Sequence, residues 1–219
     1  EFEMGCSPGD VDCELDQKPS HTVTLSPFLL LETEVTEAQY LAVMADDPSC
    51  DYGEGGGPNS PVECVSWEDA TAFCEQVGGR LPTEAEWEYA GRGGTSTRYY
   101  CGDDAACLDD IAWHGGNSGT HKHDVKDKKP NAFGLYDMLG NVWEPVSDWY
   151  SPGYYTISPD SDPEGPDSGS FHVMRGGDWA SSNPPANNPK YLSVSWRMQH
   201  TPSFPGDRIG LRCAKDSCT

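Results

Sequence analysis

The sequence predicts one α+β domain over residues 1–219, with short helices, small sheets and a large share of ordered coil. Gly (24 residues) and Pro (18 residues) are frequent, which indicates many turns and short elements. Helical and strand-like apolar patterns are confined to short segments. Trp, Tyr and Phe nevertheless occur from end to end, so the chain carries the large apolar side chains that a folded core requires.

The first strand and the first helix are predicted near the start of the chain. The segment "HTVTLSPFLLLE" (residues 21–32) begins with alternating apolar side chains and continues as an apolar run, which is typical of strand. A helix follows in "TEAQYLAVM". It begins at Thr36, because Gln39 stands three residues later and can reach back to the cap, as in a capping box.

Two further helices are predicted from their caps and their periodicity. The second helix begins at Ser66 and ends at the glycine pair 78–79. The third begins at Thr83, where Glu86 completes a capping box, and ends at Gly91. The apolar face predicted for the second helix consists of Trp67, Ala70, Phe73, Cys74 and Val77.

The remainder of the chain is predicted to be irregular, with strands only near its end. Residues 93–170 show no helical pattern longer than about two turns. The segments "FHVMRGG" (residues 171–177) and "DRIGLRCA" (residues 207–214) are predicted as late strands. Loops this long are usually functional or held in place by ligands and disulfides.

The charge balance excludes several classes of partner. The net charge is −22, with 36 acidic and 14 basic residues, so a basic patch for nucleic acid or for anionic membrane is not expected. An apolar run of about 18 residues is missing from the sequence, which argues against membrane insertion. Two interpretations of the acidity stay open: solubility, and a site for a cation.

Nine cysteines indicate disulfides and an oxidising compartment. Three pairs lie close together in turn-rich segments and can each close a small loop: Cys6 with Cys13, Cys50 with Cys64, and Cys101 with Cys107. None of these pairs has the spacing of a zinc site. We therefore expect a secreted, periplasmic or cell-surface protein, in which Cys218 is the unpaired thiol.

Several longer motifs carry a resemblance to a known family. They include "FLLLETEVTEAQYLAVM", "GGRLPTEAEWEYAGRGG", "NAFGLYDMLGNVWEPVSDWY", "VMRGGDWA" and "IGLRCA". Together they resemble the formylglycine-generating enzyme (sulfatase-modifying factor) family over nearly the whole chain. The resemblance implies a compact, coil-rich variant of the C-type lectin fold and a disulfide between Cys74 and Cys213. The family contains oxidases, inactive paralogues and diversified ligand-binding proteins, so membership alone does not set the activity.

The resemblance also locates the place where the copper-using members of the family carry two cysteines. Their thiolates bind Cu(I), which selects soft ligands. In this chain Asp178 stands where the family has a serine after the glycine pair, and Ser181 stands at the position of the first cysteine. Counting back from Arg197, which matches the family's arginine, the second cysteine position falls near Pro189. A hydroxyl and a proline do not replace two thiolates, so neither copper nor formylglycine synthesis is expected.

The same segment carries many small and polar side chains, and two interpretations of it stay open. It is either an ordinary surface loop or a ligand-binding surface over residues 178–208, where the oxidases of the family bind peptide. Aromatic, Ser and Asn side chains make adaptable contacts, which favours the ligand-binding surface. The residues predicted to form this surface are Asp178, Ser181, Ser182, Asn183, Asn187, Asn188, Lys190, Tyr191, Arg197, His200, Phe204 and Arg208.

The motif "YDMLGNVWE" resembles the calcium site of the family. By this match, Asp137 and Glu144 provide side-chain oxygens, while Gly140 and Val142 provide carbonyl oxygens. Calcium takes six to eight oxygen ligands, which a tight loop can supply. The alternative is a turn in which Glu144 accepts only local hydrogen bonds. A bound Ca²⁺ is expected to be structural.

The sequence is compatible with two functions. The first is a non-catalytic module that binds a protein or peptide ligand through residues 178–208, in a specific version a retroelement-diversified variable protein. The second is a metal-dependent oxidase or oxygenase with an altered active site. The second requires Asp178, His200 or Arg197 to take part in the chemistry.

Overall fold

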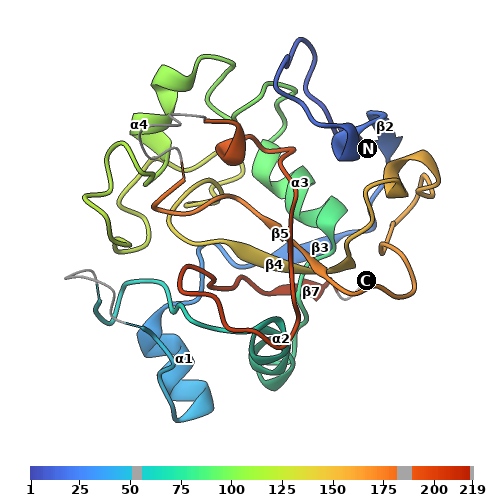
Figure 1. The fold of residues 1–219 in the computed structure, drawn as a ribbon. Helices are drawn as coiled ribbons and strands as arrows, with labels where there is room; N and C mark the ends of the chain where they lie inside the picture. Colours follow the sequence, from blue (N-terminus) through green and yellow to red (C-terminus); the bar gives the residue numbers. More distant parts are fainter. Residues whose placement is uncertain (51–55, 182–188, 218–219) are drawn as a thin grey trace.

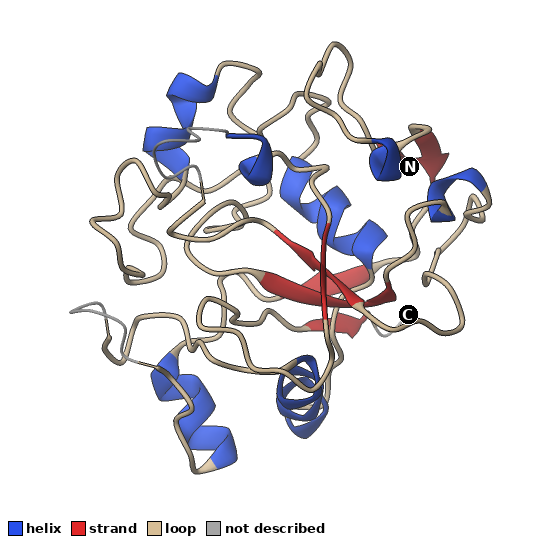
Figure 2. Cartoon of the chain, viewed as in Figure 1, coloured by secondary structure: helices blue, strands red, loops and turns tan. Residues whose placement is uncertain are grey.

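The computed structural model describes residues 1–50, 56–181 and 189–217. Short helices surround small antiparallel sheets, and loops make up much of the chain (Figures 1 and 2). The predicted class, an α+β fold with three short helices and much coil, is confirmed. Within the described residues, no helix is long and apolar enough to cross a membrane.

The three predicted helices are present, and each begins with a capping box. The expected partners Thr36 with Gln39 and Thr83 with Glu86 are both found, and Ser66 forms a third box with Asp69. The bounds are α1 (Glu37–Met44), α2 (Trp67–Gln76) and α3 (Glu84–Arg92).

Two details of the helix predictions are wrong. Helix α3 continues through Gly91 to Arg92. Its C-cap is Gly93, which takes the left-handed conformation (φ 57°) that is common at the end of a helix. Val77 follows the end of α2 and is 47% exposed, so it does not share the buried face of the helix.

The strands form two pairs and one three-stranded sheet, all antiparallel. In the three-stranded sheet, β5 lies between β4 and β6. The bounds of the strands are β1 (Phe2–Met4) paired with β2 (His21–Val23), β3 (Phe28–Leu30) paired with β7 (Ala214–Asp216), and β4 (Glu144–Trp149), β5 (His172–Arg175) and β6 (Met198–His200).

The strand predictions are confirmed in part. The segment 21–32 contains two strands, β2 and β3, instead of one, and the segment 171–177 contains β5. The segment 207–214 is not a strand before Ala214. It crosses the core with a single parallel bridge between Ile209 and Trp143, and its chain passes so close to Val142 that a Cβ at position 210 would lie 2.6 Å away.

The middle segment (residues 93–170) contains one short α-helix and two single turns of 3₁₀ helix, as the sequence predicts, but it also contains the six-residue strand β4, which was not predicted. The short helices of this segment are η2 (Ala105–Cys107), α4 (Leu108–Ile111) and η3 (Tyr154–Thr156), and two further 3₁₀ turns, η1 (Leu15–Gln17) and η4 (Pro189–Leu192), lie outside it.

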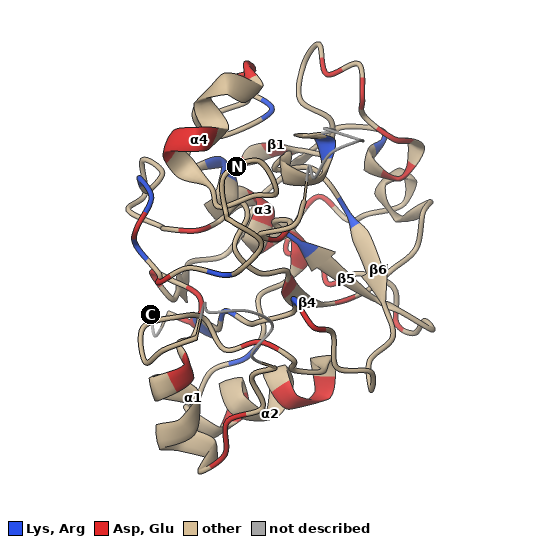
Figure 3. Ribbon diagram, turned by 60° about the vertical axis from the view of Figure 1, so that its left-hand side comes forward, with Lys and Arg blue, Asp and Glu red and all other residues tan. Residues whose placement is uncertain are grey.

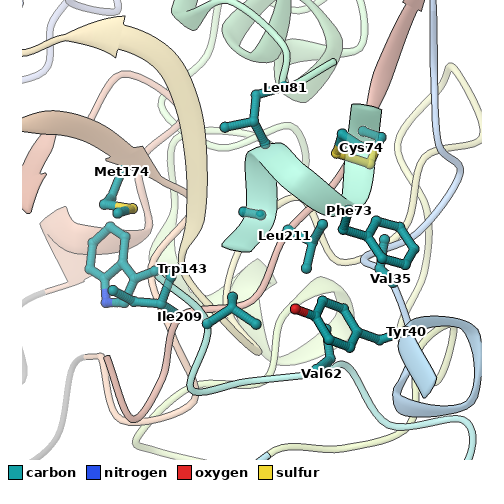
Figure 4. Close-up of a cluster of buried hydrophobic side chains, with 13 residues drawn as sticks. Val35, Tyr40, Val62, Phe73, Cys74, Leu81, Trp143, Met174, Ile209 and Leu211 are labelled. Atoms are coloured by element: carbon teal, nitrogen blue, oxygen red, sulfur yellow. A yellow bond between two sulfur atoms is a disulfide. The ribbon is translucent and has the colours of Figure 1, made fainter. Parts of the chain in front are cut away.

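One buried apolar cluster links α1, α2 and the sheets. Phe73 of α2 stacks on Tyr40 of α1 with ring centroids 5.2 Å apart. Figure 4 shows this pair beside Leu211 and the disulfide of Cys74. Trp143 lies at the other end of the cluster, near Met174 (Figure 4). This end of the core borders the candidate site.

The described residues contain four disulfides, and all four match the expected pairs. Cys74 of α2 bonds to Cys213, which directly precedes β7, and so joins residues 139 positions apart. The other three bonds, Cys6–Cys13, Cys50–Cys64 and Cys101–Cys107, close loops of 7, 14 and 6 positions. Cys218 lies outside the described residues.

Candidate ligand-binding site

A cavity of about 530 Å³ opens between the segment that follows β5, strand β6 and the loop before β7. Gly176 and Gly177 both have positive φ (92° and 82°) and turn the chain from β5 toward the cavity. Apolar and aromatic side chains alternate with a few polar ones along the wall. The lining residues are Trp143, Asp178, Ala180, Ser181, Tyr191, Trp196, Met198, His200, Gly206, Asp207, Arg208 and Ile209.

The polar part of the wall is centred on the buried carboxylate of Asp178. The hydroxyl of Ser181 donates to Asp178 Oδ1 at 2.7 Å, and the amide of Ala180 donates to the same oxygen at 3.1 Å. Arg208 Nη1 lies 3.0 Å from Asp178 Oδ2. Burial raises the pKa of Asp178, and the Arg208 guanidinium opposes this shift. The hydroxyl of Ser181, the residue that the resemblance places at the first cysteine position of the copper-using oxidases, is thus hydrogen-bonded to a carboxylate.

The aromatic part of the wall comes from the segment just before β6. Tyr191 and Trp196 meet edge to face with ring centroids 4.9 Å apart. The ammonium of Lys190 lies 4.8 Å from the Trp196 centroid and 2.8 Å from a carboxylate oxygen of Glu14. The Lys190 ammonium thus makes a cation–π contact with the aromatic wall.

The structure brings much of the predicted surface together. Five of the predicted residues line the cavity: Asp178, Ser181, Tyr191, His200 and Arg208. Lys190 contacts the aromatic wall. Phe204 is 64% exposed, and its ring centroid lies 6.1 Å from that of His200. The predictions for Ser182, Asn183, Asn187 and Asn188 fall outside the described residues.

The prediction for Arg197 is wrong. Its side chain is 0% exposed and points away from the cavity into a buried ion pair, where Nε lies 2.7 Å from Glu84 Oε1. Arg197 directly precedes β6, and its side chain does not line the cavity, whereas that of the next residue, Met198, does. Of the three residues that an altered oxidase could use, Asp178 and His200 therefore line the cavity and Arg197 does not.

Sequence reasoning missed several residues of the wall. Trp143 precedes β4, Ile209 lies in the segment that was predicted as a strand, and Met198 begins β6, which was not predicted. None of these residues carries a local signal for ligand binding, because each is a single apolar side chain among polar or mixed neighbours. Only the tertiary pairing of β5 with β6 and of Trp143 with Ile209 brings them together.

The candidate calcium loop has one side chain that fits a cation and one that does not. Asp137 is buried, and its Oδ1 has no hydrogen-bond partner within the described residues. Burial raises the pKa of Asp137 to about 6, and a cation at this place would favour its ionised form. Glu144 accepts hydrogen bonds from Arg212 (2.8 Å) and from the Trp87 indole (2.6 Å). Glu144 is thus paired with a guanidinium, and calcium stays a prediction for this loop.

The backbone of the same loop is tightly constrained. Gly140 has a φ of 83°, and a Cβ there would lie 2.2 Å from the carbonyl oxygen of Trp113. Asn141 has a φ of 58° and donates from its amide to Glu34 at 2.8 Å. Glu34 is a buried carboxylate that sequence reasoning missed, and burial raises its pKa. The nearby carboxylate of Asp137 raises it further.

The buried carboxylate of Asp148 predicts that the stability of the protein depends on pH. Burial raises the pKa of Asp148 to about 7, and the negative charge of Glu84 adds to the shift. Because this pKa in the folded state exceeds the value near 3.9 of an unfolded chain, the folded protein binds an extra proton between these two pH values. The proton on Asp148 therefore adds most to the free energy of unfolding below about pH 4, and its contribution is lost as the pH rises through 7.

Asp148→Asn is expected to remove this dependence. At pH 8 the variant is more stable than the wild type by about 2 kcal/mol, less than the full shift allows, because the new amide needs an acceptor. At pH 4 the advantage disappears. Urea unfolding of both proteins at the two pH values measures the difference. An equal difference at both pH values contradicts the assignment.

Comparison with known proteins identifies the family. A model of the sulfatase-modifying factor enzyme 1-like domain matches residues 1–217. The formylglycine-generating enzyme of Streptomyces coelicolor is 35% identical, over 99% of this chain and 87% of that protein. The solved structure of Treponema denticola variable protein 1 has a TM-score of 0.84 and 33% identity, over 99% of this chain and 94% of that one. PvdO from Pseudomonas aeruginosa has a TM-score of 0.83 and 27% identity, over 99% and 91% of the two chains. The chain therefore belongs to the formylglycine-generating enzyme (sulfatase-modifying factor) family.

Proposed function

We propose that this protein is a non-catalytic member of its family that binds a protein ligand through the cavity beside β6 and the surface around it. The observation that carries the proposal is the state of the first cysteine position. Ser181 stands there, and its hydroxyl is bonded to the buried carboxylate of Asp178, which is itself paired with Arg208. Hard oxygen donors held in an ion-pair network are poor ligands for Cu(I), which selects thiolates.

The shape and lining of the cavity support a binding role. Aromatic side chains and a methionine provide apolar contact area, while Ser181, His200 and Arg208 place polar groups among them. Rigid aromatic anchors with adaptable polar neighbours are typical of surfaces that bind proteins. The exposed ring of Phe204 extends the surface beyond the cavity.

The similarity to a variable protein of Treponema denticola supports the more specific version of the proposal, a retroelement-diversified receptor. In this version the segment between "RGGDW" and "IGLRCA" is the variable one, and part of it lies outside the described residues. A near-copy of the DNA of this segment beside a reverse-transcriptase gene is then expected. A genome that lacks such a copy rules this version out.

The protein is proposed to work outside the cytoplasm with a structural calcium ion. Four disulfides are typical of an oxidising compartment. A Ca²⁺ at the loop of Asp137 would take the unpartnered Oδ1 and stabilise the coil around it.

Calcium is expected to raise the melting temperature relative to EDTA by several degrees. Asp137→Asn removes most of this difference, whereas Asp127→Asn, an aspartate outside the proposed ligand set, keeps it. Thermal melting of the three proteins in Ca²⁺ and in EDTA tests the proposal. Identical melting of the wild type in both conditions contradicts a calcium site.

The binding function is tested with a variant that fills the cavity. Ala180 lines the cavity and is partly exposed, so Ala180→Trp adds bulk there and leaves the side chains of Asp178, Ser181 and Arg208 in place. Ala132→Trp is the matched control, because Ala132 is exposed and does not line the cavity. Immobilised wild type and control are expected to capture the same surface proteins from extracts of the source organism and its neighbours, and Ala180→Trp is not. Equal capture by all three proteins contradicts a ligand site at the cavity.

A further inference from the structure

Strand β6 forms one edge of the three-stranded sheet (Figure 3). In an antiparallel pair, each residue directs its amide N–H and its carbonyl toward the same neighbour, and successive residues alternate. The direction in which each residue of β6 points therefore follows from the bonds that β5 makes on its other side.

Contacts at both ends of β5 show which of its residues direct their backbone groups toward β6. Pro145 of β4 lies opposite Met174 and has no N–H, so it cannot complete a hydrogen-bonded pair with Met174. At the other end, the N–H of Tyr150 donates to the carbonyl of Phe171 at 2.7 Å. Phe171 thus faces β4, and the next residue, His172, faces away from it. His172 and Met174 therefore both direct their backbone groups toward β6, on either side of the irregularity in β4.

The partners of these two residues in β6 are His200 and Met198. Their backbone groups are used by β5, so the residue between them, Gln199, directs its N–H and C=O to the outer edge of the sheet. Within the described part of the chain, the backbone of Gln199 makes no hydrogen bond to a segment outside this sheet. Its side chain is exposed. The edge therefore presents one donor and one acceptor in the geometry that an added strand requires.

The same edge borders the cavity. Met198 and His200 both line the cavity, and Gln199 lies on the other face of the strand. In an added antiparallel strand, the residue that pairs with Gln199 places its side chain away from the cavity. The residues before and after it place their side chains on the cavity face, beside Met198 and His200. One extended ligand can therefore pair with the backbone of Gln199 and at the same time place a side chain against the apolar wall of the cavity.

The charge of the molecule defines the ligand further. The net charge is −22, and the exposed carboxylate of Asp207 lies at the rim of the cavity. Figure 3 shows Asp and Glu spread over the ribbon. A segment with Lys or Arg beside its apolar side chain is attracted to this surface, and an acidic one is repelled.

We propose that the partner binds as an extended segment that pairs with Gln199 as an added strand of the sheet and places a large apolar side chain, flanked by basic residues, in the cavity. This inference rests on the proposed binding function and specifies how the ligand binds. Backbone pairing supplies sequence-independent affinity, and the cavity selects the side chain.

The probe for the test is a phage-displayed library of random seven-residue peptides, selected on the wild-type protein. Selected peptides are expected to share one large apolar residue with Lys or Arg nearby, and to bind more weakly as salt is added. Each is then synthesised with one backbone nitrogen methylated at a time. Methylation of the residue that pairs with Gln199 is expected to weaken binding by about tenfold or more, while methylation of its two neighbours changes binding little.

Two substitutions in the protein test the same contact from the other side. Gln199→Pro removes the outward N–H at an edge position where proline is tolerated, and Gln199→Ala keeps it. Weaker binding to the first variant by about tenfold, with the second near the wild type, supports the added strand. Circular dichroism of both variants confirms that they are folded.

The outcomes separate this inference from the proposed function. If Ala180→Trp abolishes peptide binding but neither Gln199→Pro nor any methylation weakens it, the cavity is the ligand site and the added strand is wrong. If none of these changes affects binding, both are wrong. Failure to select any peptide overturns the added strand, because an extended segment is its occupant, and leaves the capture experiment with Ala180→Trp to decide the binding function.

Discussion

Replacing Cys74 and Cys213 together with alanine is expected to lower the free energy of unfolding by about 5 kcal/mol. The bond closes a loop of 139 positions, and the entropy that a cross-link removes from the unfolded chain grows with the length of the loop. Both residues belong to the buried cluster of α2 and the sheets, so alanine is chosen to avoid placing an unsatisfied hydroxyl there. Urea unfolding of the wild type and the double variant measures the difference.

The matched control is the double alanine variant of Cys101 and Cys107, whose loop spans 6 positions. The same relation gives about 2 kcal/mol for this bond. The effect of the long loop should therefore be more than twice that of the short one. Equal losses for the two bonds would show that loop length does not set their contribution in this protein.

The second large effect is expected from Arg197→Met. Arg197 donates to both carboxylate oxygens of Glu84 at 2.7 and 2.8 Å, and both side chains are buried. Burial alone would raise the pKa of Glu84, but the guanidinium groups of Arg197 and Arg175 hold it below its ordinary value. Removing Arg197 leaves a buried carboxylate with only the more distant Arg175, at 3.7 Å, and costs about 4 kcal/mol at neutral pH.

The double variant Arg197→Met with Glu84→Gln tests whether the loss comes from the unpaired charge. Replacing both partners of a buried ion pair is far less costly than removing one of them. The double variant is expected to recover at least about half of the loss in the free energy of unfolding, measured in urea at pH 7. A double variant as unstable as Arg197→Met alone would mean that packing of the guanidinium is the larger contribution.

The helices could be predicted because their signals are local. Thr36, Ser66 and Thr83 each act through a partner three residues away, and this partner is visible in the sequence. The short-range disulfides were also predictable, because their cysteines lie in turn-rich segments only 6 to 14 positions apart. The family resemblance supplied the fold and the pair Cys74–Cys213, which spacing alone does not reveal.

The strands and the wall of the cavity could not be predicted in the same way. Strands β1, β6 and β7 are three residues long, and unlike β2 and β3, which are equally short, they do not lie in a longer alternating or apolar run. Arg197, which matches the family's arginine, was assigned to the ligand-binding surface, yet its charge is balanced by Glu84, 113 positions earlier in the chain. Trp143 reaches the cavity only through its pairing with Ile209. Such contacts depend on tertiary structure that local patterns do not encode.

We propose that this chain has the fold of the formylglycine-generating enzymes without their copper chemistry. We would titrate the protein, with its disulfides intact, with Cu(I) in competition with a chromogenic chelator, and then measure oxygen consumption in the presence of a cysteine-containing peptide. Cu(I) is expected to stay with the chelator, and oxygen consumption is expected to equal that of a protein-free control. One equivalent of tightly held Cu(I), together with oxygen consumption that depends on the peptide, would contradict it.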